Sequence, residues 1–106
     1  SVEYARSERL GKVVGGLKSA TRLLKAMSNE SRLVVLSTLA QDGEASVGAL
    51  EPAVGLSQSA LSQHLARLRR DGLVTTRRDA QTIYYSLASD DVRTVLNALS
   101  GMYGAR

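Results

Sequence analysis

The feature of this sequence that most constrains its fold is a turn at residues 55–57 followed by a helical segment with two unlike faces, residues 58–70. On a helical wheel, Leu61, Leu65 and Leu68 lie within about 40° of one another and form a narrow apolar stripe. The opposite face carries hydroxyl and amide side chains near its start and arginines near its end. This pattern predicts a helix that packs on a core with one face and presents hydrogen-bonding groups to a partner with the other.

The residues before this segment predict three more helices. Apolar residues recur at helical spacings over residues 7–27, and shorter patterns of the same kind cover residues 30–40 and 46–54. The pair Gly15–Gly16 lies inside the first of these, where it indicates either a weak point or the close approach of another helix. Residues 1–6 carry no such pattern, so we expect a poorly ordered arm within one domain that spans all 106 residues.

After Gly72 the pattern changes from helical to alternating. Residues 73–78 and 82–87 alternate and are rich in β-branched and aromatic side chains, with a basic loop at residues 77–81 between them. Residues 89–103 return to helical spacing, behind a serine and an aspartate that suit a helix N-cap. A mainly helical chain with a small β-hairpin directly after a turn and a polar-faced helix predicts a winged helix-turn-helix fold.

The polar helix and the hairpin together favour DNA as the partner. Ser and Gln side chains can bond base edges in the major groove, and Arg side chains can reach bases or phosphates. The tip of the hairpin extends sideways, so its arginines and glutamine can meet phosphates or the minor groove. A formal net charge of +4 agrees with a polyanionic partner.

The same composition argues against several other functions. There is no cysteine, and a single imidazole, His64, cannot hold a metal ion without further ligands. His64 lies on a flank of the polar helix, where packing at the edge of the core and a phosphate contact both remain open. Ser59 and Ser62 have no neighbouring base other than His64 and no enclosed pocket, so we expect no enzyme and no cofactor. No apolar run reaches membrane-spanning length, and we expect a cytoplasmic protein.

Three runs of residues carry a resemblance to a known family. The runs are 24–33, 56–65 and 73–87, and they resemble the ArsR/SmtB family of winged helix-turn-helix repressors, with similarity over residues 10–104. The closing run, 98–104, is most similar to the branch of that family that contains nodulation regulators. The resemblance implies a homodimer, joined through its first and last helices, that occupies an inverted repeat in double-stranded DNA and represses promoters.

The predicted site residues follow from this resemblance and from the polar face and hairpin. The predicted DNA-contacting residues are Ser57, Gln58, Ser59, Ser62, Gln63, His64, Arg67, Arg70, Arg77, Arg78, Gln81 and Thr82. The predicted dimer contacts are Leu10, Val14, Leu17, Val92, Val95, Leu96, Leu99, Met102 and Tyr103.

The chain departs from the family at its sensing positions. Metal-binding members carry cysteines where this chain has residues 46–48, or His and carboxylate ligands where it has Asp91 alone. Thiol-sensing members carry cysteines where it has Ser37 and Gly104. We therefore expect a repressor without a metal or thiol site, and no small-molecule effector is indicated.

Two alternatives remain: an effector-responsive repressor whose sensing residues are absent or replaced, and a winged-helix protein-interaction module that does not bind DNA.

Overall fold

A computed structural model of the chain describes residues 2–104, apart from the side chains of residues 2, 4, 5, 13 and 14. The described part is mainly helical with one small antiparallel sheet, as predicted. The helices are α1 (Val2–Gly15), α2 (Leu17–Met27), α3 (Glu30–Asp42), α4 (Val47–Val54), α5 (Gln58–Arg70) and α6 (Asp90–Tyr103). The strands are β1 (Ala45–Ser46), β2 (Val74–Asp79) and β3 (Thr82–Leu87).

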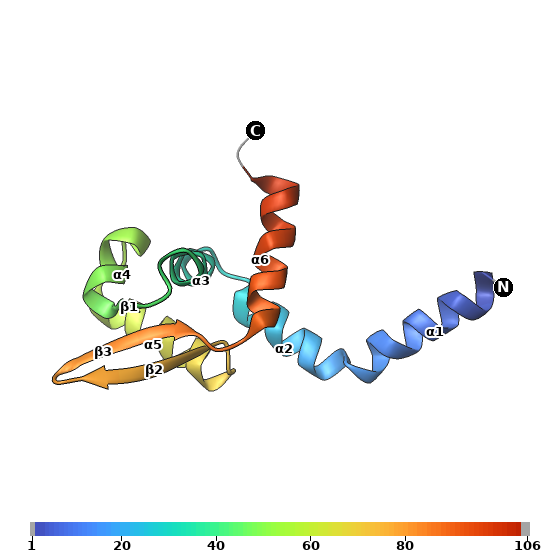
Figure 1. Cartoon of the computed structure of the whole chain (residues 1–106), viewed down its shortest axis with the longest axis horizontal. Coiled ribbons are helices and arrows are strands. Elements are labelled where there is room, and N and C mark those ends of the chain that lie inside the picture. The colour runs from blue at the N-terminus through green and yellow to red at the C-terminus, as the bar shows by residue number, and fades with distance from the viewer. Residues whose placement is uncertain (1, 105–106) are drawn as a thin grey trace.

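The predicted first helix is in fact two helices. α1 ends at Gly15, Gly16 has φ −101° and ψ 12°, and α2 starts at Leu17. A side chain at Gly15 would meet no other described atom within 4 Å, so within this chain the glycine pair marks a break and not a close contact between helices. Within the segment expected to be an arm, residues 2–6 belong to α1, and residue 1 lies outside the described residues. α1 projects from the body of the molecule as a separate rod (Figure 1).

The core lies where α3, α4 and α5 pack together beside the sheet. The stripe of Leu61, Leu65 and Leu68 on α5 is fully buried, as predicted, and it meets Leu36 and Leu39 of α3 in the same cluster. Burying a leucine side chain contributes roughly 1.5–3 kcal/mol. This burial fixes the rotation of α5 about its own axis, so the polar face of the helix is turned away from the core.

Side-chain caps begin α3, α4, α5 and α6, and the cap of α6 is the serine that the sequence predicts. Asn29, Ser46, Ser57 and Ser89 each accept a hydrogen bond from a backbone N–H two or three residues further on, at 3.0–3.2 Å. The turn between α4 and α5 needs Gly55, whose φ of 74° lies in the left-handed region that a side chain disfavours. Caps and turn together set where the polar helix begins.

The wing is the outer part of a three-stranded sheet with the order β1-β3-β2. β1 was not predicted; it consists of Ala45 and Ser46, which pair with Tyr85 and Tyr84 of the central strand. Ser46 is also the N-cap of α4, so the strand passes into the helix with no loop between them. The base of the wing is therefore joined directly to the helix-turn-helix.

The tip of the wing is shorter than predicted. Arg77 and Arg78 belong to β2 and pair with Tyr84 and Ile83, so they are not loop residues. The turn itself lies between Asp79 and Thr82, and Ala80 in it has φ 54°. The two arginines consequently have positions fixed by the sheet.

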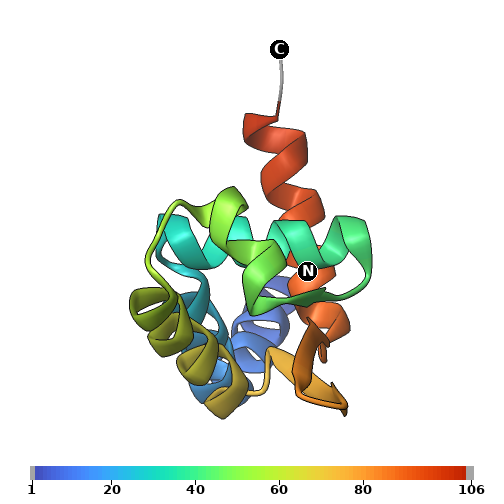
Figure 2. The same ribbon diagram turned by 90° about the vertical axis from the view of Figure 1, so that its left-hand side faces the viewer.

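α5 and the wing lie on the same side of the molecule. In Figure 1 the hairpin runs in front of α5, and in the perpendicular view of Figure 2 the two elements lie next to each other along the lower edge, with α4 above them. α6 rises away from this edge, and α1 leaves the body on the side opposite the wing tip (Figure 1). The edge formed by α5 and the wing is the surface on which the predicted DNA contacts converge.

Candidate nucleic-acid interface

The polar face of α5 is exposed along most of its length. Gln58, Ser59, Ser62, Gln63 and Arg70 are exposed, while the leucine stripe behind them has no exposed surface. The first turn of the helix also presents backbone N–H groups and partial positive charge, which favour a nearby phosphate. This face can donate and accept hydrogen bonds over three helical turns, which matches the edges of bases in a major groove. Ser57, which caps the helix, is exposed beside it.

The wing adds a second set of exposed polar groups. Arg78, Gln81 and Thr82 are exposed at or beside the tip, as the prediction of DNA contacts requires. Arg78 is the charged member of this set, and no carboxylate of the described residues forms an ion pair with it. A guanidinium at the end of a hairpin suits contact with a phosphate beside the groove.

Arg77 is held differently from Arg78. Its Nε donates to Glu44 Oε2 at 2.9 Å and its Nη2 donates to Glu44 Oε1 at 2.5 Å, so the pair is bidentate. The guanidinium carbon also lies 4.4 Å from the centre of the Tyr84 ring. The hydrogen bond from Arg77 lowers the pKa of the Glu44 carboxyl, and the same bond raises the pKa of Arg77. Arg77 therefore braces the wing against the residue before β1, a contact that the sequence analysis missed.

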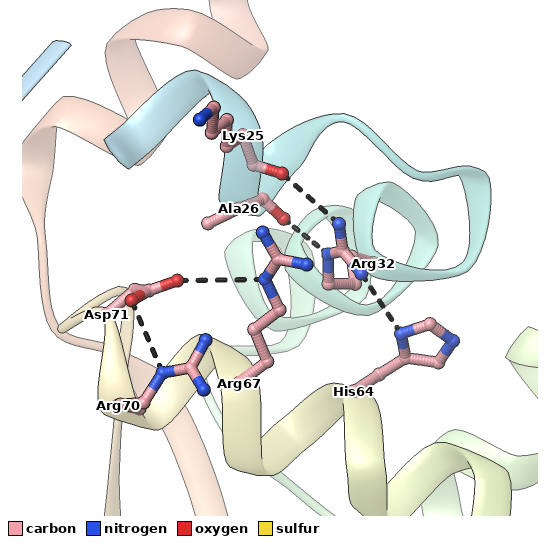
Figure 3. A network of polar contacts seen from close by, with 7 residues as sticks. All are labelled: Lys25, Ala26, Arg32, His64, Arg67, Arg70 and Asp71. Atoms are coloured by element: carbon pink, nitrogen blue, oxygen red, sulfur yellow. Dashed lines mark hydrogen bonds and ion pairs between the residues drawn. The ribbon is translucent and has the colours of Figure 1, made fainter. Parts of the chain in front are cut away.

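A buried arginine connects α2, α3 and α5, as Figure 3 shows. Arg32 of α3 is 7% exposed, and its Nε donates to Ala26 O at 2.5 Å while its Nη2 donates to Lys25 O at 3.2 Å. Its Nη1 lies 3.3 Å from His64 Nδ1 on α5. Because a guanidinium only donates, this contact is a hydrogen bond when His64 Nδ1 accepts it. Burial lowers the pKa of Arg32, the charge of Arg67 lowers it further, and Asp71 opposes this effect.

His64 and Arg67 lie on the flank of α5 that faces α2 and α3 (Figure 3). His64 is half-buried against Arg32, a contact that favours packing at the edge of the core, while its role in binding DNA stays a prediction. Arg67 Nε lies 3.8 Å from Asp71 Oδ2, and Arg70 Nε lies 3.7 Å from Asp71 Oδ1. His64 therefore contacts a residue of its own chain and Arg67 only lies near one, whereas Arg70 remains largely exposed.

The predicted dimer residues whose side chains the structure describes divide into three groups. Leu10, Leu17, Met102 and Tyr103 expose 62%, 52%, 50% and 79% of their surface, and Val95, Leu96 and Leu99 are half-buried. Val92 is wrong as a dimer contact, because it is fully buried in the core of its own chain. The side chain of Val14 lies outside the described residues.

The two positions that the resemblance matched to cysteines of thiol-sensing members lie near each other. Ser37 and Gly104 both line a hollow of about 510 Å³ between α3 and α6. Among the described residues, no three His, Cys, Asp or Glu side chains are grouped so that they could hold a metal ion. Within the same part of the chain, no helix combines the length and the apolar character needed to cross a bilayer.

Comparisons with known proteins agree with this geometry. Residues 29–76 match the profile described as "Bacterial regulatory protein, arsR family". The chain is 59% identical over 85 residues to nodulation protein NolR of Rhizobium meliloti, covering 80% of this chain and 69% of that protein. It is 56% identical over 84 residues to transcriptional activator HlyU of Vibrio cholerae, covering 79% and 77%. The crystal structure of NolR from Sinorhizobium fredii superposes with a TM-score of 0.80 at 54% identity, covering 90% of this chain and 94% of that one.

Proposed function

The chain belongs to the ArsR family of bacterial DNA-binding transcription regulators, and on that basis we propose that it acts in the cytoplasm as a dimeric repressor that occupies an inverted repeat. The observation that carries this proposal is the exposed polar face of α5 beside the wing, with a fully buried leucine stripe behind it. Because one of its relatives is named an activator, the direction of regulation is part of the test.

We assign base reading to the first two turns of α5. Gln58, Ser59, Ser62 and Gln63 present amide and hydroxyl groups that pair with base edges, and Gln suits the two hydrogen bonds that adenine offers in the major groove. Arg70 lies at the end of the same face. Ser57 stays a predicted contact at the helix N-terminus, where its neighbouring backbone amides favour a phosphate.

We assign backbone contacts to the wing. Arg78, Gln81 and Thr82 are exposed at its end, and they would meet phosphates or the minor groove beside the bases that α5 reads. Arg77 would act mainly by holding the wing through Glu44. His64 and Arg67 would orient α5 from its inner flank, although the sequence analysis counted them as DNA contacts.

The dimer part of the proposal rests on apolar side chains that the single chain leaves in water. Leu10 of α1, Leu17 and Leu24 of α2 and Tyr103 of α6 are all more than half exposed. Burying side chains of this size contributes roughly 1.5–3 kcal/mol each. A two-fold dimer formed through these helices would present two copies of α5 to successive major grooves, which is the geometry that reads an inverted repeat.

Selection from a random duplex pool tests the proposal. The expected product is an inverted repeat whose half-sites are about one helical turn apart, about 10 base pairs, with an affinity that falls steeply as salt rises. A reporter placed behind the selected site should be expressed less when the protein is present. No enrichment, or equal affinity for selected and random duplexes, would refute sequence-specific binding and favour the protein-interaction alternative.

A further inference from the structure

A basic hollow lies between α2 and the C-terminal end of α5, beyond the first two turns of α5 that we assign to base reading. It has a volume of about 460 Å³. Five cationic side chains line it, and only one carboxylate accompanies them. The cations are Lys18, Arg22 and Lys25 of α2 with Arg67 and Arg70 of α5, and the carboxylate is that of Asp71.

The single carboxylate does not satisfy the two arginines of α5. Asp71 lies 3.8 Å from Arg67 Nε and 3.7 Å from Arg70 Nε, so one charge is shared between two guanidiniums. Both distances exceed that of a hydrogen bond. The positive charges contributed by α2 have no carboxylate of their own among the residues that line the hollow. The local charge is therefore strongly positive.

The clearest indication of a bound anion is an unsatisfied hydrogen-bond donor on Arg67. Its Nε is buried and has no hydrogen-bond partner among the described residues. A buried donor without an acceptor is costly, and native proteins leave few of them without water, an ion or a ligand. The charge of Arg67 also disfavours the protonated form of Arg32, since it lowers the pKa of that group. An anion next to Arg67 would relieve both effects.

We propose that this hollow binds a phosphate group. Several cations with at least two guanidinium forks suit an anion that has three or four acceptor oxygens and close to two charges, more than they suit a single carboxylate. The phosphate has two sources of the same chemistry: the backbone of duplex DNA that runs beside α5, or a free phosphate compound. The first source rests on the proposed function, whereas the second does not.

A titration without DNA tests the hollow itself. The isotope-labelled full chain is titrated with inorganic pyrophosphate in chloride buffer while backbone amide signals are recorded. The expected changes concentrate in residues 17–25 and 67–71. The double variant Lys18→Gln/Arg22→Gln should bind pyrophosphate at least fivefold more weakly. Arg9→Gln/Lys12→Gln on α1 removes the same two charges away from the hollow and should bind as the wild type does.

A second measurement identifies the source of the phosphate. If the DNA backbone occupies the hollow, Lys18→Gln/Arg22→Gln should flatten the slope of log affinity against log salt by about one to two relative to the α1 variant. If a free phosphate compound occupies it, the two slopes should agree, and millimolar pyrophosphate should change the operator affinity of the wild type but not that of the hollow variant.

The proposal is overturned by one combined result. That result is pyrophosphate shifts that are absent or scattered over the surface in every variant, together with equal salt slopes for the two double variants. If the chain fails to select a duplex sequence at all, the proposed function fails, yet the pyrophosphate titration still reports on the hollow. The two failures are therefore distinguishable.

Discussion

Replacing Arg32 with methionine should destabilise the fold, because methionine keeps a similar stem and removes every donor of the buried guanidinium. Arg32 donates to two carbonyls at the end of α2 and to His64 on α5. Hydrogen bonds that involve a charged group contribute roughly 1.5–3 kcal/mol each. The variant no longer has to bury a charge, and this offsets part of the loss. The net expected loss in the free energy of unfolding is about 2–4 kcal/mol.

Urea denaturation followed by helical circular dichroism measures this loss. For a domain of this size, each 1 kcal/mol corresponds to a decrease of roughly 4–8 °C in Tm, so a thermal scan gives an independent check. Arg93→Met is the matched control, because Arg93 makes one exposed hydrogen bond, to Ala40 O at 3.5 Å. The control should stay within about 0.5 kcal/mol of the wild type.

A double-mutant cycle with His64→Ala isolates the contact between α3 and α5. The expected coupling is about 0.5–1.5 kcal/mol, since the two groups share one hydrogen bond. If the free energy of unfolding of Arg32→Met lies within about 1 kcal/mol of that of the wild type, water replaces the hydrogen bonds of the guanidinium at little cost. Strict additivity in the cycle would show that Arg32 does not hold α5 in place. Either result would refute the reasoning.

Three further results are expected. Gln63→Ala should cost about 1–3 kcal/mol at the selected site and little on random duplexes, as competition binding can measure, and equal losses on both would remove Gln63 from base reading. The lowered pKa of Glu44 means that its pairing with Arg77 stabilises the fold at neutral pH and is lost as pH falls through that depressed pKa. The wild type should therefore lose more stability than Glu44→Gln between neutral pH and about pH 3, and parallel acid-denaturation curves would contradict the ion pair. Tyr103→Glu should raise the dissociation constant of the proposed dimer at least tenfold in sedimentation equilibrium. An unchanged constant would show that the dimer interface does not include Tyr103.

Features that depend on near neighbours in the chain could be predicted from the sequence. The leucine stripe of α5 follows from helical spacing alone, and it fixes which residues face outward. The caps at Asn29, Ser46, Ser57 and Ser89 follow from short polar side chains placed just before apolar runs. Together these features locate the exposed face of the candidate site.

Features that depend on distant parts of the chain could not be predicted in this way. Arg32 meets His64 across 32 residues, and Arg77 meets Glu44 across 33, and no local pattern marks either pair. β1 has only two residues, too few for an alternating pattern to show. Val92 lies on the same apolar stripe of α6 as the other predicted dimer contacts. Helical spacing cannot distinguish residues that face the chain's own core from residues that face a partner, so Val92 was predicted wrongly.

The double role of Ser46 has a mechanical consequence. Ser46 pairs with the central strand of the wing, and its hydroxyl also caps the first turn of α4. No loop residues therefore separate the sheet from α4. A tilt of the wing must therefore be transmitted to α4 and, through the short turn, to α5. We therefore expect the chain to adjust to DNA duplexes of different curvature by moving its wing, α4 and α5 together, and not by bending the wing alone.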